Sequence, residues 1–390
     1  MRARPATGPS SAWLAVSAFA FLLAPLLAWS AGARAQEVDP HRLRVPPGFA
    51  IGIYAHVPGA RSLAVGPGGV VFVGTREEHV YAVTPDGHAQ VFAPDVAFHD
   101  PNGVCFGPGG TLYVAERNRI RAFPRANALD PAFHDVVPEG ALIPPDEARS
   151  GNHAARYCRV GPDGGLFVAV GQPYNVPPRD KLALYARVGM GAILRFTRDG
   201  HGRTIYASGI RNSVGLDFNP HDGTLWFTDN QVDMMGDDVP PGELNRATHA
   251  GLNFGFPWYG GGHTRTHEYA DDTPPAGVVF PQVEMIAHAA DLGMIFYRGH
   301  QFPPAYRGAI FSAQHGSWNR TVPVGARIMV TFLHRDGTAA STQVFADGWL
   351  DATAHRYMGR PVDVAMLRDG SLLVSDDYAG LIWRITYRGS

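Results

Sequence analysis

A short unit recurs six times along the chain and limits what the chain can fold into. Each copy is a turn rich in glycine, proline and aspartate followed by a short apolar or aromatic strand, and most follow a β-rich run such as SLAV, NGVCF or VGLDF. The copies occupy residues 66–75, 107–117, 161–171, 219–230, 367–377 and, more loosely, 303–317. Glycine at a turn position that needs positive φ, between two such runs, is typical of a β-hairpin. The sequence therefore predicts six hairpins.

Six hairpins predict an all-β fold, a six-bladed β-propeller with four strands in each blade. A single hairpin would leave one sheet face exposed, whereas a closed ring of blades buries both faces. Ring closure should join the two ends of the chain, so we expect residues 48–57 to pair with residues 380–387. A two-sheet sandwich is the alternative fold.

Three long segments follow the repeated strands: 125–152, 172–190 and 229–302. In a propeller such loops gather on one face around the central channel, which is where ligands bind. We therefore expect the functional residues on the channel face.

The N-terminus predicts export of the protein. Residues 1–35 read as a signal peptide, with Arg2 and Arg4 before an apolar stretch and an Ala33-Arg34-Ala35 cleavage motif. The remaining 36–390 would form a single domain, periplasmic or secreted, with no further segment apolar enough to span a membrane; an uncleaved membrane anchor is the alternative. Removing three arginines and no acid lowers the formal charge from −2 to about −5, which does not suggest a nucleic-acid partner.

The chain has two cysteines, Cys105 and Cys158, at similar positions in successive repeats. An exported protein can keep a disulfide, and neighbouring blades could bring the two residues together. Bonding requires Cα atoms within about 7 Å. We expect two buried free thiols, with a disulfide as the alternative.

Several polar groups lie at the edges of the predicted loops and could carry chemistry. Arg211-Asn212 offers donors that match a carboxylate, and His153 precedes the third hairpin. The acidic run from Asp229 to Glu243 lacks the spacing of a regular calcium loop, and HGSWNR (315–320) crowds aromatic and basic groups together. Taken one at a time, each of these groups could equally be a solvated loop residue.

Two of these segments carry a family resemblance. GIRNSVGLDFNPHDGTLWFTDN resembles the glucose/sorbosone dehydrogenase family, the soluble pyrroloquinoline quinone (PQQ) sugar dehydrogenases, and HGSWNR is similar to a segment of its sorbosone-dehydrogenase-like branch. The resemblance extends over roughly residues 48–387. It implies a propeller in which Arg211 and Asn212 contact the cofactor quinone.

The resemblance also implies a catalytic base. The segment SGNHAARYCRVGPDGGLFVAVG (150–171) is similar to the family's His-x-x-(Gly/Ala)-Arg run before a hairpin, so His153 would take the proton of the sugar hydroxyl, with Arg211 beside it. A pKa near neutrality suits this task. The family's neighbouring acidic residue is replaced by Asn152, so we expect Asp146 or Glu147 to fix the tautomer of His153.

Further cofactor contacts follow from the same resemblance. Calcium beside PQQ would be held by the backbone carbonyls of Gln231 and Val232. His315 or Arg320 falls near the family's cofactor-contacting lysine, and Arg360 falls where the family places arginines against the PQQ carboxylates. The family pattern Arg-x-Arg-Asp-Val is reduced here to Arg360-Pro-Val-Asp-Val, so one arginine is missing.

The sequence thus predicts PQQ- and calcium-dependent oxidation of an aldose or sorbosone-type sugar. No C-x-x-C-H haem motif is present, so electrons would leave to a separate quinone or cytochrome acceptor. A calcium-dependent sugar lactonase on a similar propeller and a non-catalytic binding propeller are the alternatives. Basic side chains that face one cavity would favour PQQ.

Overall fold

The computed structural model describes residues 38–389, and these contain the six blades that the repeats predict. The predicted signal peptide lies outside the described residues. Among residues 38–389, no helix is long and apolar enough to cross a membrane. Each repeated unit forms the turn and second strand of one blade, and the turn carries a glycine with positive φ in every case: Gly69, Gly110, Gly164, Gly223, Gly308 and Gly370.

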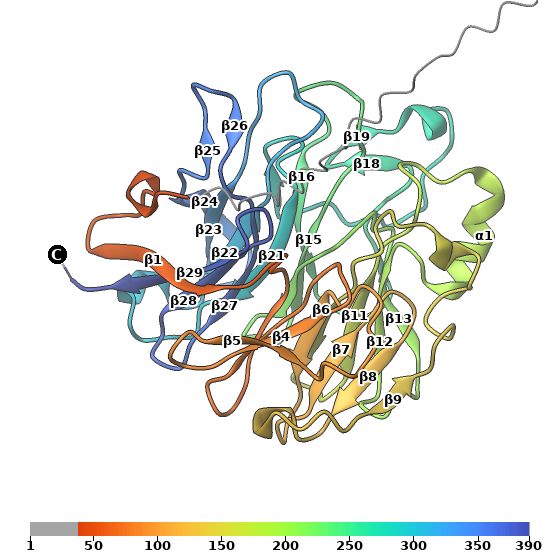
Figure 1. Cartoon of the computed structure of the whole chain (residues 1–390). Helices are drawn as coiled ribbons and strands as arrows, with labels where there is room; N and C mark the ends of the chain where they lie inside the picture. The colour runs from red at the N-terminus through yellow and green to blue at the C-terminus, as the bar shows by residue number, and fades with distance from the viewer. Residues whose placement is uncertain (1–37, 390) are drawn as a thin grey trace, which may run out of the picture. The chain divides into compact units, whose positions relative to one another are not determined.

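The blades follow one another along the chain (Figure 1). Blades one and two are β2 (Leu63–Val65), β3 (Val71–Val73), β4 (Val80–Val83) and β5 (Ala89–Phe92), then β6 (Gly103–Phe106), β7 (Leu112–Ala115), β8 (Ile120–Phe123) and β9 (His134–Val137). Blade three is β10 (Tyr157–Val160), β11 (Leu166–Val170), β12 (Ala192–Phe196) and β13 (Thr204–Ser208), and it gains a fifth, parallel strand, β17 (Leu252–Asn253).

Blades four to six complete the ring. Blade four is β14 (Leu216–Phe218), β15 (Leu225–Asp229), β16 (Gly242–Ala247) and β20 (Val283–Met285); blade five is β21 (Asp291–Phe296), β22 (Ile310–Gln314), β23 (Arg327–Leu333) and β24 (Ala339–Ala346). Blade six is β27 (Pro361–Met366), β28 (Leu372–Asp376), β29 (Leu381–Tyr387) and β1 (Phe49–His56).

The long segments are less irregular than the sequence predicts. Segment 172–190 contains the helix α1 (Arg179–Val188), and segment 229–302 contributes β16, β20 and β21 to the blades. Two short ribbons, β18 (Tyr259–Gly261) with β19 (Thr264–Arg265) and β25 (Leu350–Asp351) with β26 (Arg356–Tyr357), stand outside the blades. The 3-10 turns are η1 (Pro40–Arg42), η2 (Ala126–Ala128), η3 (Glu147–Arg149), η4 (His267–Tyr269) and η5 (Pro304–Tyr306).

The ring closes as predicted. β1 pairs antiparallel with β29, from Phe49 opposite Tyr387 to His56 opposite Leu381, and the two strands lie side by side in Figure 1. The first strand of each blade contacts the first strand of the next, and β27 of the last blade returns to contact β2 of the first. The first and last segments of the propeller are therefore held in one sheet.

The core consists of one apolar cluster between each pair of neighbouring blades. Side chains that alternate along one strand enter different clusters: Trp226 packs toward blade five, while Leu225 and Phe227 pack toward blade three. A seventh cluster joins Ala155, Val214, Leu292 and Val362, each just before or at the start of the first strand of its blade. This cluster, called the axial layer below, joins four of the six blades.

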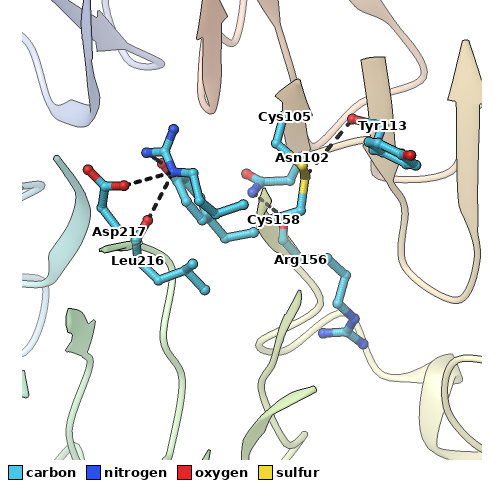
Figure 2. The surroundings of a disulfide bond; sticks show 9 residues. Asn102, Cys105, Tyr113, Arg156, Cys158, Leu216 and Asp217 are labelled. Carbon is cyan, nitrogen blue, oxygen red and sulfur yellow. Dashed lines mark hydrogen bonds and ion pairs between the residues drawn. A yellow bond between two sulfur atoms is a disulfide. The ribbon is translucent and has the colours of Figure 1, made fainter. Parts of the chain in front are cut away.

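The two cysteines form a disulfide, so the expectation of free thiols is wrong. Cys105 lies on β6 and Cys158 on β10, and their Cα atoms are 5.7 Å apart. The first strands of blades two and three are neighbours around the ring, which brings the two residues within bonding range. Close by, the Asn102 side chain donates to the Arg156 carbonyl oxygen at 2.8 Å, a second link between the same blades (Figure 2).

We predict that this disulfide contributes about 2–4 kcal/mol to the free energy of unfolding, because it constrains an unfolded chain over 53 residues of separation. The Cys105→Ala/Cys158→Ala protein should unfold at lower urea concentration than the oxidised wild type. Thiol titration of denatured, unreduced wild type should find no reactive thiol. Two reactive thiols, or equal urea midpoints, would contradict the assignment.

Candidate functional site

A cavity of about 250 Å³ opens above the axial apolar layer, and most of its charged lining groups are basic. Ala155, Val214 and Leu292 of that layer form its apolar floor. Three arginines, three histidines and two aspartates line it: Arg61, Arg76, Arg211, His153, His288, His315, Asp233 and Asp291. The cavity therefore suits an anionic ligand.

His153 lies on the loop before β10, and its ring is fixed by a backbone carbonyl. Its Nδ1 lies 2.6 Å from the carbonyl oxygen of Gln172. A carbonyl oxygen only accepts, so Nδ1 carries the hydrogen and Nε2 keeps its lone pair. The His153 carbonyl accepts from Nη1 of Arg156 at 2.9 Å. The backbone of His153 has φ of +49°, a left-handed conformation that costs a non-glycine residue energy and is common at functional sites.

Two expectations about His153 are corrected. Neither Asp146 nor Glu147 binds its ring: Asp146 pairs with Arg149, and Glu147 accepts from Lys181 and Tyr185. The pKa of His153 is not near neutrality, because burial first and the charge of Arg211 next lower it to about 3. The imidazole is therefore a neutral acceptor at physiological pH.

Arg211 and Asn212 are held in place by Asp229 at the end of β15. The backbone N–H groups of both residues donate to the Asp229 carboxylate, at 2.9 and 2.7 Å. The Arg211 guanidinium donates to the Asn175 side chain and to Asp233, both at 2.7 Å. The side-chain oxygen of Asn212 is buried and has no hydrogen-bond partner among the described residues, and Asn212 lines the cavity.

Gln231 and Val232 follow β15 directly. Gln231 lines the cavity, and its side-chain nitrogen donates to Asp229 at 3.0 Å, while its side-chain oxygen is buried with no partner in residues 38–389. Val232 is buried and its N–H donates to the Gly260 carbonyl at 3.0 Å. Behind Gln231, Asp229 and Glu243 lie opposite each other on β15 and β16. Burial raises the pKa of both acids, and repulsion by Asp229 raises that of Glu243 further.

The acidic run does not converge into a calcium loop. Asp229 and Glu243 are buried in strands, Asp233 pairs with Arg211, and Asp238 pairs with Arg320. Within residues 38–389, no group of three or more His, Cys, Asp or Glu side chains could hold a metal ion. A metal here would need carbonyl or amide oxygens.

The other predicted cofactor contacts divide into two sets. His315 lines the cavity, with Nε2 2.8 Å from Asp377, a carboxylate that also pairs with Arg61. Arg320 and Arg360 are not among the lining residues. Arg320 donates to Asp238 and to the Ala287 carbonyl, and Arg360 donates to the carbonyls of His315 and Gly316. In this structure they support the loops around the site.

Arg61, Arg76, Asp291 and Asp377 are lining or supporting residues that the sequence analysis did not select. Arg61 could have been found, because it precedes the first strand of blade one as Arg360 precedes that of blade six. Asp291 begins β21, and burial raises its pKa to about 7; its Oδ2 has no hydrogen-bond partner among the described residues. Nothing in the sequence around Arg76, Asp291 or Asp377 distinguishes them from solvated residues.

Several solved structures share this fold, at sequence identities that establish the fold alone. A Trichoderma reesei enzyme of the carbohydrate-active family AA12 superposes with a TM-score of 0.73 at 20% identity, covering 88% of this chain and 97% of that one. The PQQ domain of pyranose dehydrogenase from Coprinopsis cinerea gives 0.69 at 17% identity, covering 88% and 97%. The PQQ-bound aldose sugar dehydrogenase of Streptomyces coelicolor gives 0.61 at 19% identity, covering 88% and 99%.

Sequence comparison gives the family. An uncharacterized protein of Borreliella burgdorferi is 30% identical over 367 residues, covering 90% of this chain and 93% of its own. The model of the glucose/sorbosone dehydrogenase family matches residues 142–317, which include His153, Arg211, Asn212, Gln231 and His315. With the six-bladed fold and the basic cavity at the matched segment, these similarities show that the chain belongs to the glucose/sorbosone dehydrogenase family, a family of sugar oxidoreductases.

Proposed function

We propose that this protein oxidises an aldose or a sorbosone-type sugar with PQQ and calcium as cofactors. The observation that carries the proposal is the cavity in which Arg61, Arg76, Arg211 and three histidines face one space. PQQ is a flat tricarboxylate, and guanidinium groups bind carboxylates with two parallel hydrogen bonds.

The residues present fit PQQ in charge and in hydrogen-bonding type. Arg61, Arg76 and Arg211 would donate to its carboxylates and carbonyls, and His315 and Asn212, which line the same cavity, would make further contacts with it. When bound, the quinone supplies the two-electron acceptor for the sugar. Arg61 is our candidate for the arginine missing from the family pattern. Arg320 and Arg360 stay predicted cofactor residues, and in this conformation their guanidinium groups are bound to protein oxygens.

The residues around Gln231 also fit calcium, which prefers oxygen ligands. The backbone carbonyls of Gln231 and Val232 are the proposed ligands. The unpartnered Gln231 side-chain oxygen and the buried acids Asp229 and Glu243 make this corner of the cavity favourable for a cation. Bound calcium would act there as a Lewis acid that polarises a carbonyl.

In the proposed reaction, Nε2 of His153 accepts the proton of the sugar hydroxyl. The Gln172 carbonyl holds the ring in the tautomer that leaves this nitrogen free. Arg211, fixed by Asn175 and Asp233, keeps a positive charge beside it. The apolar floor of Ala155, Val214 and Leu292 keeps that side of the cavity dry, which strengthens these electrostatic contacts.

The alternatives receive less support. A calcium lactonase would need side-chain carboxylates and amides that converge on the channel axis, and the axial position above the first strands is an apolar layer here. A binding propeller needs no unpartnered, buried polar atoms in its cavity wall.

Export remains the proposed localisation, and the disulfide is consistent with an oxidising compartment.

The central test is reconstitution of the purified protein with PQQ and calcium, followed by dye reduction across a panel of aldoses and sorbosone. We expect His153→Ala to lose about 10²–10⁴-fold in turnover while it still binds PQQ, because removal of a positioned base costs about that much. His249→Ala, at an exposed loop histidine, is the matched control. Near-full activity of His153→Ala would refute the role of His153, and no PQQ-dependent turnover by wild type would refute the function.

The pKa of His153 predicts a pH dependence of stability. The unfolded histidine takes up a proton near pH 6.5, whereas the folded ring resists protonation down to about pH 3. Above pH 6.5 the neutral ring of His153 therefore costs the folded state nothing relative to the unfolded chain. The free energy of unfolding falls as the pH drops from 6.5 toward 3, because only the unfolded histidine gains a proton. Urea titrations of the apoprotein from pH 7 to 4 should show a steeper loss for wild type than for His153→Ala. Equal slopes, or ring NMR shifts that titrate near pH 6, would contradict this.

Cofactor retention should depend on two arginines in different ways. Arg76 is exposed and donates only to the Gly151 carbonyl, so Arg76→Ala should weaken PQQ binding by about tenfold with little change in melting temperature. Arg61 is buried against Asp377, so Arg61→Ala should weaken binding by about tenfold or more and also lower the melting temperature. Arg195→Ala, on the outer part of blade three, is the control. Wild-type PQQ affinity in both variants would exclude this cavity as the cofactor site.

A further inference from the structure

Three loops that belong to blades four and five form one wall of the cavity and carry an unusual exposed surface. They are residues 230–241, 286–290 and 315–326, called the rim loops below. Of the ten large apolar side chains that are exposed in residues 38–389, five lie on the rim loops, which make up under a tenth of those residues. These five are Met234, Val239, Ile286, Trp318 and Val322, with Met234 74% and Trp318 71% exposed.

The rim loops are fastened to one another by side chains. Arg320 donates to Asp238 at 3.0 Å and to the Ala287 carbonyl, and so joins all three loops. His288 contacts the carbonyls of Gly236 and Val239 at 2.7 and 2.9 Å. A surface that is already ordered loses little conformational entropy when a partner binds.

The charge on the rim loops is acidic. They contain three aspartates, Asp233, Asp237 and Asp238, against one arginine. The side chain of Arg320 is only 10% exposed, whereas that of Asp238 is 89% exposed, so the negative charge faces solvent. The whole of residues 36–390 carries a formal charge of about −5. A partner with a basic face would be attracted at long range.

We propose that the rim loops are the docking surface for a small, basic electron-transfer protein. Exposed apolar groups with tryptophan among them mark interaction sites, and transient redox complexes need only small interfaces. Trp318 and His288 also line the cavity, so a partner seated on this surface lies over the site where electrons are released. Oxidation of one hydroxyl releases two electrons and two protons, and each haem iron accepts one electron, so two cytochrome molecules are reduced per sugar. This inference rests on the proposed function.

The test uses cytochrome c, a small basic haem protein, as the probe. Met234→Asn/Val322→Ser removes two exposed apolar groups that do not line the cavity, and asparagine tolerates the φ of +67° at Met234. Ile53→Ser/Val344→Ser, on β1 and β24, removes two exposed apolar side chains away from the rim loops and is the control. Binding of cytochrome c to the apoproteins is followed by haem absorbance in sedimentation velocity at 20 and 200 mM salt.

We expect wild type and the control to bind cytochrome c at 20 mM salt, and to bind it at least tenfold more weakly at 200 mM salt. At 20 mM salt the rim variant should bind cytochrome c about tenfold more weakly than wild type does. In the PQQ-loaded enzymes, the rim variant should reduce a small dye at the wild-type rate but reduce cytochrome c about tenfold more slowly. The proposal is overturned if wild type does not bind cytochrome c, or if the rim variant binds it with the same affinity as wild type. Self-association of wild type that the rim variant abolishes also overturns it, because the surface would then join two copies of this chain.

The two proposals fail separately. If no sugar reduces the dye, the proposed function is wrong, while the binding of cytochrome c to the apoprotein still decides for or against the docking surface. If the dye is reduced and cytochrome c binding does not depend on the rim loops, only the docking surface is wrong.

Discussion

The structure depends on the burial of every blade between two others. The second strand of each blade is buried along its whole length, as in β11 and β28, and its side chains alternate between the clusters on its two faces. A blade at an open end would expose one of these faces to water. The antiparallel pairing of β1 with β29 removes that open end, because it makes one blade from both ends of the chain.

Ring closure also determines where a site can form. The first strands of neighbouring blades contact one another around the ring, and Ala155, Val214, Leu292 and Val362 pack together at or just before the start of four of them. Within the strands, Asp363 accepts from the Leu63 N–H at 2.8 Å and from the Tyr157 hydroxyl at 3.3 Å, which ties blades one, three and six together. The cavity lies against this apolar layer and is lined by the loops that precede and follow these strands.

The polar groups of the cavity are held by the backbone as much as by one another. Asp229 orients the main chain of Arg211 and Asn212, and the Gln172 carbonyl orients His153. Buried charges are costly unless paired, and here Arg211 has Asp233 while His315 has Asp377, shared with Arg61. Four of the eleven buried side-chain atoms without partners in the described part of the chain belong to residues that line the cavity: Asn212, Gln231, Asp291 and Asn319. We interpret these four unsatisfied groups as preparation for a ligand.

The six hairpins, the ring and its closing pair of strands could be predicted from the sequence, because turn glycines and the alternation of apolar residues along a strand are local patterns. It also selected His153, Arg211, Asn212, Gln231 and His315, all of which line one cavity. Three features could be read only from the folded chain. Cys105 bonds to Cys158, and Gln172 rather than Asp146 or Glu147 orients His153. Arg61 and Arg76 line the cavity, whereas Arg320 and Arg360 do not. Each of these depends on which loops of different blades meet around the axis. Such contacts, and the burial that lowers the pKa of His153, join residues far apart in the chain and leave no local pattern in the sequence.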